Sequence, residues 1–115
     1  MDIVHIPSQG ALKLYYQQRY GGALLDEDIK ALLQTGTAIA TLEHINQKYS
    51  ETFGDRNTAA KKALDASDLR AAVDSNFDAQ AVGWREEGFS EEKIDKARAE
   101  LHKRNEARGL YEPWE

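Results

Sequence analysis

The chain has 115 residues, 41% hydrophobic and 30% charged, and its 20 acids against 15 bases give a net charge of −5. The absence of cysteine excludes disulfide bonds, cysteine-ligated metal sites and a cysteine nucleophile. The acidic balance disfavours a purely electrostatic nucleic-acid binder, which is normally basic. This length predicts a single helical domain over residues 1–115.

The composition predicts an all-α fold, a compact bundle of four or five helices. Alanine is abundant and the two prolines, Pro7 and Pro113, flank the body of the chain. Helices favour such residues, whereas strands favour β-branched and aromatic alternation. Residues 1–7 contain isoleucine and valine and end in proline, so we expect a short extended lead-in there. We expect residues 109–115 to form an aromatic C-terminal tail.

The first two helices follow from apolar spacing. Leu12, Tyr16 and Tyr20 recur every fourth residue, which predicts a helix over residues 9–20 that Gly21-Gly22 ends. An apolar stripe over residues 29–45 predicts a second helix. We favour its continuing through the glycine at position 36, although a turn there is the alternative.

Capping residues delimit the later helices. Asn57 or Thr58 can cap a third helix, which Ser67-Asp68 could split in two. Ser90 caps a last helix that runs to about residue 108, with acids in its first turn and bases in its last. Gly109 is placed for a left-handed helix end, with the next residue folding back on the last turn.

Large apolar residues are denser in residues 1–53 than in residues 54–115. The first segment is therefore expected to build the core. The second, with an acid-rich stretch over residues 65–95, is expected to form a solvated helical layer over it.

No catalytic, cofactor-binding or metal-binding residue is predicted. His5, His44 and His102 lack the spacing of metal ligands. Arg98 and His102 share one face of the last helix, a pairing that resembles all-α ribonucleases of the HEPN type. Those enzymes have four to six residues between the pair and here there are three, so we expect a solvated charged face. The sequence thus predicts a protein that is not an enzyme and uses no cofactor.

The predicted function is non-enzymatic binding of another protein or of a second copy, as an adaptor, an inhibitor or a small subunit. Aromatic residues dominate interface energetics, and acids can face a basic partner. The candidate partner-binding residues are Trp84, Glu86, Glu87, Phe89, Glu91, Leu110, Tyr111 and Trp114.

The alternative is a small regulatory nucleic-acid binder with a helix-turn-helix-like segment over residues 29–47. Its candidate recognition helix has no arginine or lysine before Lys48, so the match is weak and nucleic acid is not the expected partner. The chain begins Met-Asp with no long apolar run, which predicts a cytoplasmic protein without a secretory signal or membrane span.

Overall fold

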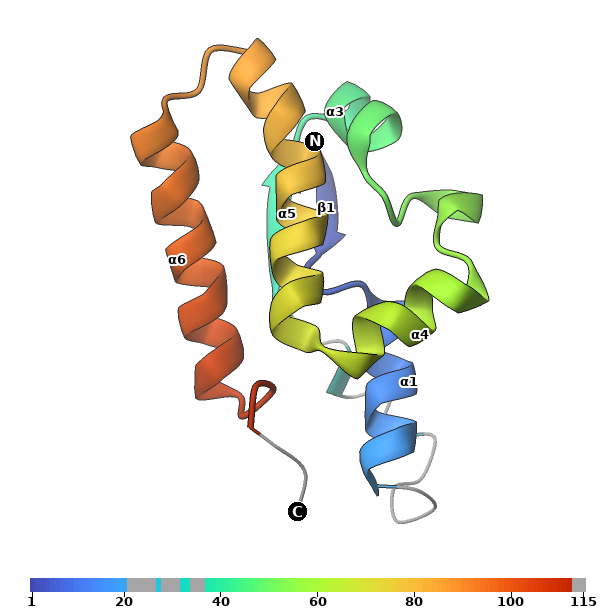
Figure 1. Cartoon of the computed structure of the whole chain (residues 1–115). Helices are drawn as coiled ribbons and strands as arrows, with labels where there is room; N and C mark the ends of the chain where they lie inside the picture. Colours follow the sequence, from blue (N-terminus) through green and yellow to red (C-terminus); the bar gives the residue numbers. More distant parts are fainter. Residues whose placement is uncertain (21–26, 28–31, 34–36, 113–115) are drawn as a thin grey trace.

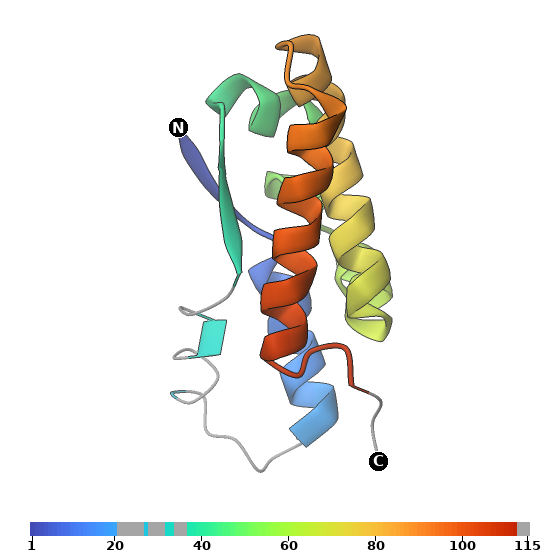
Figure 2. The same ribbon diagram turned by 90° about the vertical axis from the view of Figure 1, so that its left-hand side faces the viewer.

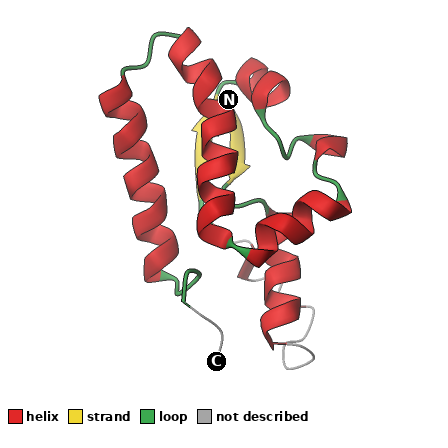
Figure 3. Cartoon of the chain, viewed as in Figure 1, coloured by secondary structure: helices red, strands yellow, loops and turns green. Residues whose placement is uncertain are grey.

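The computed structural model describes residues 1–20, 27, 32–33 and 37–112, and this part is mostly helical with a two-stranded sheet (Figure 3). Its elements, in chain order, are β1 (Asp2–His5), α1 (Gln9–Tyr20), β2 (Ala38–Thr41), α3 (Glu43–Tyr49), the 3-10 helix η2 (Gly54–Arg56), α4 (Ala59–Ser67), α5 (Leu69–Glu86) and α6 (Glu91–Ala107). None of the helices described is long and apolar enough to cross a membrane.

Helix α5 is the centre of the larger apolar core. Its residues Val73, Phe77 and Ala81 are fully buried. They pack with residues of β1, α3 and α6, including Ile45 and Leu101. In Figure 2 the two strands lie to the left of the α5–α6 pair, so that both helices are on one side of the sheet.

Residues of the first half do contribute to both apolar clusters, but the prediction that the second half is only a solvated layer over them is wrong. The apolar residues of α5 are spaced to face inward together, and alanine lets neighbouring elements approach closely. A segment with few large side chains thus became the most buried helix.

A second apolar cluster joins α1, α4 and the turn after α6. Leu12 and Tyr16 of α1 pack there with Ala66 of α4 and Leu110. This cluster brings α1, α4 and the turn after α6 together, and Figure 1 shows α1 beside α4.

The predicted caps are confirmed. Thr58 Oγ1 accepts from the Lys61 amide at 3.2 Å, and Ser90 Oγ accepts from the Lys93 amide at 3.2 Å. Gly109 has φ +73°, and the following amide, of Leu110, donates to Asn105 O at 3.2 Å, which is the expected Schellman end.

The predicted third helix is split in two. Helix α4 ends at Ser67 and α5 begins at Leu69. Asp68 caps the second of them, because its Oδ1 accepts from the Ala71 amide at 3.1 Å.

The all-α prediction needs one correction. Residues 38–41 form β2, which pairs antiparallel with β1 from Asp2↔Thr41 to His5↔Ala38. The predicted extended lead-in is thus confirmed over β1. The prediction of one helix continuing to Ile45 is wrong, because residues 38–41 pair with the backbone of β1 instead. Strand β2 also occupies part of the proposed recognition helix. Residues 28–31 and 34–36 of that predicted helix, and Trp114 of the predicted tail, lie outside the described residues.

Candidate functional site

A polar pocket of about 270 Å³ lies at the N-terminal end of α1. Three segments surround it: the end of β1, the first residues of α1, and the connection between α3 and α4 (Figure 1). We call it the N-terminal pocket. Its polar lining includes His5, Ser8, Gln9, Asn46, Thr52 and Asn57.

His5 is the last residue of β1 and is half-buried. Strand alternation turns Val4 into the core and His5 to the opposite face of the strand. The Nδ1 atom of His5 is buried and has no hydrogen-bond partner among the residues described. Buried polar atoms are nearly always paired, so this nitrogen distinguishes His5 from most buried polar groups.

Asn57, which lines the same pocket, has a second such atom. Its Nδ2 donates to Ser8 Oγ at 3.3 Å, while its Oδ1 is buried and unpaired within the described part of the chain. The two other unpaired buried side-chain atoms in that part, on Asn76 and Asn105, belong to α5 and α6. His5 and Asn57 are far apart in the sequence, and the fold brings them to one cavity.

The start of α1 favours an anion at this pocket. Ser8 caps the helix, with its Oγ accepting from the Ala11 amide at 3.2 Å. The first turn of this 12-residue helix contains no acid. No carboxylate of its own first turn therefore neutralises its free amides and the positive end of its dipole.

One cationic side chain, that of Lys62, lies beside this helix end, while Arg56 contacts the end of α3. A Cβ added at Gly10 would be 2.9 Å from Lys62 Cε, so the Lys62 side chain crosses the first turn of α1. Arg56 donates to Gln47 O at 2.6 Å and to Ser50 O at 2.9 Å, which are neutral carbonyls. Across the described ranges, no carboxylate pairs with Lys62 or Arg56.

A half-buried carboxylate anchors the connection that carries Asn57. Glu51 Oε1 accepts from Ser75 Oγ at 2.6 Å, Asn76 Nδ2 at 2.7 Å and Lys61 Nζ at 2.9 Å. Burial alone would raise the pKa of Glu51, but these hydrogen bonds outweigh it and hold the pKa below its ordinary value. The ionised side chain therefore fixes the connection to α4 and α5.

The predicted partner-binding residues that the structure describes are not at this pocket, and they do not form one surface. Trp84 is buried and lies with the exposed Phe89 near the α5–α6 turn, whereas the buried Leu110 and the half-buried Tyr111 follow the far end of α6. The predicted acids are paired: Glu86 accepts from Tyr49 Oη, Glu87 contacts His44, and Glu91 contacts Arg85.

The face of Arg98 and His102 also differs from the prediction. Both side chains contact Asp74 Oδ1, Arg98 Nη1 at 3.0 Å and His102 Nε2 at 2.8 Å. They are partly buried rather than solvated, with 25% and 16% of the side-chain surface exposed.

Comparisons with known proteins supply one relative. The chain is 32% identical over 106 residues to "Deoxyribonuclease CdiA" of Dickeya dadantii (strain 3937). The match covers 92% of this chain and 3% of the length of that protein. No protein-family model and no solved structure matches the chain.

This similarity contradicts the prediction of a non-enzymatic binding protein and the expectation that nucleic acid is not the partner. Two features of the chain hid this from the sequence. Net charge averages over the whole chain and hides local cations such as Lys62. In addition, polar groups gathered from separate segments leave no motif, and the only sequence signal was a histidine just before a helix cap.

Proposed function

We propose that this chain cleaves DNA by hydrolysing a phosphodiester bond in the N-terminal pocket. The observation that carries the proposal is that His5 and Asn57, each with an unpaired buried side-chain atom among the described residues, line one pocket at the positive end of α1. The similarity to a protein named as a deoxyribonuclease supports DNA as the substrate.

The phosphate of the substrate would lie at the first turn of α1. Free amides at a helix start bind phosphate oxygens, and the Lys62 ammonium adds a positive charge at that end. The amide of Asn57 and the hydroxyl of Ser8 supply further polar contacts from the side of the pocket. These groups position the phosphate and stabilise the charge that develops on it.

His5 would move the proton. A water oxygen bonds to phosphorus while the imidazole of His5 takes a proton from that water. The bond from phosphorus to the leaving deoxyribose oxygen breaks, and that oxygen takes up a proton from solvent. Proton transfer by a positioned side chain contributes about 10²–10⁴-fold to the rate.

Nicking of supercoiled plasmid DNA tests the proposal, with reactions run in Mg²⁺ and in EDTA. We expect His5→Gln to slow nicking at least about 100-fold, because it removes the proton acceptor. The matched control is His44→Gln, since His44 is exposed and pairs with Glu87 away from the pocket. It should nick at the wild-type rate.

Asn57→Leu separates a role in the site from a role in folding. It removes the polar atoms that face the pocket, so it should slow nicking while circular dichroism shows the wild-type helix content. Wild-type nicking by a folded His5→Gln protein, or no nicking by the wild-type chain in either buffer, would overturn the proposal.

A further inference from the structure

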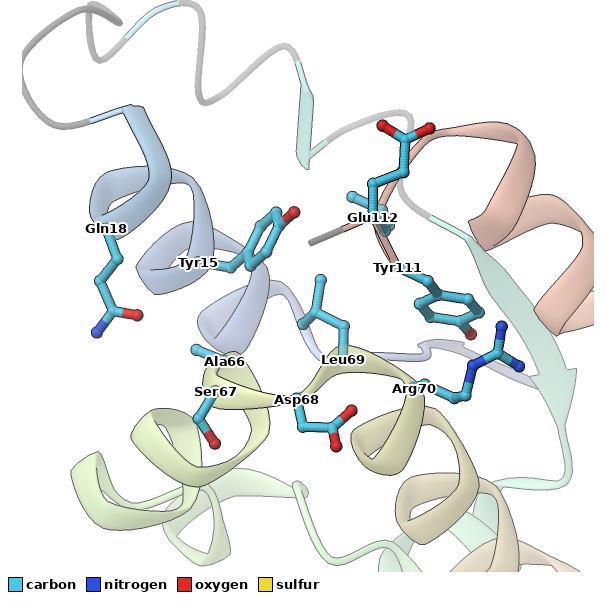
Figure 4. A pocket seen from close by; sticks show the side chains of 10 residues that line it. Tyr15, Gln18, Ala66, Ser67, Asp68, Leu69, Arg70, Tyr111 and Glu112 are labelled. Atoms are coloured by element: carbon cyan, nitrogen blue, oxygen red, sulfur yellow. The ribbon is translucent and has the colours of Figure 1, made fainter. Parts of the chain in front are cut away.

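A second and larger cavity, of about 610 Å³, lies between α1, the α4–α5 junction and the turn after α6. We call it the C-terminal cavity. Figure 4 shows Tyr15 of α1 and Tyr111 of the turn on opposite sides of it, with Leu69 between them. Its volume is within the range of small-molecule sites.

The Tyr111 side chain is held in place by a chain of hydrogen bonds. Its hydroxyl lies 2.6 Å from His102 Nδ1, and His102 Nε2 lies 2.8 Å from Asp74 Oδ1. Burial raises the pKa of Tyr111, so its phenol stays neutral. The result is an oriented, uncharged aromatic ring at the edge of an open cavity.

Arg70 adds a cation beside that ring. Its guanidinium carbon is 4.3 Å from the centroid of the Tyr111 ring, and its Nη2 is 2.7 Å from Glu106 Oε1. Both side chains of this ion pair are 52% exposed. Exposed pairs of this kind contribute little to stability, so Arg70 can exchange Glu106 for a phosphate at low cost.

We propose that the C-terminal cavity is a nucleotide subsite, which takes one base of the DNA against the half-buried Tyr111 ring and the attached phosphate on Arg70. Tyr15 and Leu69 are buried, with 3% and 4% of their surface exposed, and form part of the cavity wall. Aromatic rings with an adjacent cation are the usual means of holding an unpaired base. The inference rests on the proposed function for the identity of the nucleic acid.

The acids at the cavity limit what it can hold. Asp68 caps α5, and Glu112 lies near Gly109 at the same turn. These carboxylates disfavour a second and third phosphate, which selects a single nucleotide of a strand over a nucleoside triphosphate. Gln18 lines the C-terminal cavity and Gly10 lines the N-terminal pocket. The two residues are about 12 Å apart along α1, which corresponds to roughly three to four base steps of a stacked strand.

Titration with deoxyadenosine 5′-monophosphate tests the subsite without any cleavage, because this probe contains no phosphodiester bond. We expect amide chemical-shift changes in the full chain at Tyr15, Leu69, Arg70 and Tyr111. Deoxyribose 5-phosphate, which has no base, should bind at least about fivefold more weakly, the lower end of what one base–aromatic stack contributes.

Three variants separate the ring, its hydroxyl and the cation. Tyr111→Phe keeps the ring and should bind the nucleotide within twofold of wild type, whereas Tyr111→Leu should weaken binding at least about fivefold. Arg70→Gln should weaken binding of the nucleotide but not of deoxyadenosine, which has no phosphate. Circular dichroism checks that each variant folds.

Equal binding of the nucleotide and deoxyribose 5-phosphate would overturn the subsite, as would unchanged affinity in a folded Tyr111→Leu protein. If that variant does not fold, the shift map and the Arg70→Gln comparison decide instead. Nucleotide binding in the cavity without plasmid nicking would overturn the proposed DNA cleavage alone. Nicking that depends on His5, without nucleotide binding, would overturn the subsite alone.

Discussion

Replacing Gly10 by alanine should separate activity from stability at the N-terminal pocket. The added Cβ would lie 2.9 Å from Lys62 Cε and 3.2 Å from Asn57 Nδ2. Carbon atoms in good contact are about 3.5–4.0 Å apart, so the Lys62 side chain has to move by roughly 0.6 Å or more. Asn57 moves less.

The two consequences have opposite signs. The Lys62 side chain is flexible and gives way at little cost, while alanine is better than glycine in a helix by up to about 1 kcal/mol. The free energy of unfolding should therefore stay the same or rise by up to about 1 kcal/mol. Both displaced groups are proposed to bind the phosphate, and misplacement by an ångström can cost about 100-fold, so nicking should fall at least about tenfold.

Urea unfolding followed by circular dichroism measures the first effect, and plasmid nicking measures the second. A Lys62→Ala background is the control, because removing the crowded side chain should leave Gly10→Ala with little further effect on nicking. An unchanged nicking rate in the single Gly10→Ala variant would refute the reasoning, as would a decrease fully explained by lost stability.

Three further predictions concern the supporting structure. Gly83→Ala would place a Cβ 2.7 Å from Ile45 Cγ2, so urea unfolding should show a loss of about 1–3 kcal/mol with unchanged nicking per folded molecule. Glu51→Gln should destabilise the fold most at neutral pH, because the pKa of Glu51 is lowered in the folded chain. The ionised carboxylate contributes fully to the free energy of unfolding above its ordinary pKa of about 4.3. This contribution is lost as pH falls through the pKa of the folded chain. The difference in urea midpoint between the two proteins should therefore be larger at pH 7 than at pH 3.5. Ser90→Ala should cost about 1 kcal/mol in the same assay by removing the cap of α6.

Local signals predicted much of the helical part of the fold. The caps at Thr58 and Ser90, the break at Asp68 and the left-handed end at Gly109 each depend on a few adjacent residues. Such residues satisfy or interrupt backbone hydrogen bonds within one turn of the helix, so their effect is visible without knowledge of the rest of the chain.

The site could not be predicted in this way. His5 and Asn57 belong to segments with no common spacing, and their unpaired atoms exist only once β1, α1 and the α3–α4 connection enclose a pocket. The same limit applied to Arg98 and His102, because their shared partner Asp74 comes from a different helix. Candidate chemistry was consequently missed where it depended on contacts between separate elements.

The chain has 115 residues, no cysteine and a net charge of −5. By itself the sequence determined the helical character, the caps and the extended lead-in, because these depend on backbone preferences over a few residues. Tertiary structure decided that Ala38–Thr41 pairs as a strand and that α5 is the centre of the core. It also decided that the Lys62 side chain of this acidic chain lies against the first turn of α1, because charge acts over distances in space and not along the sequence.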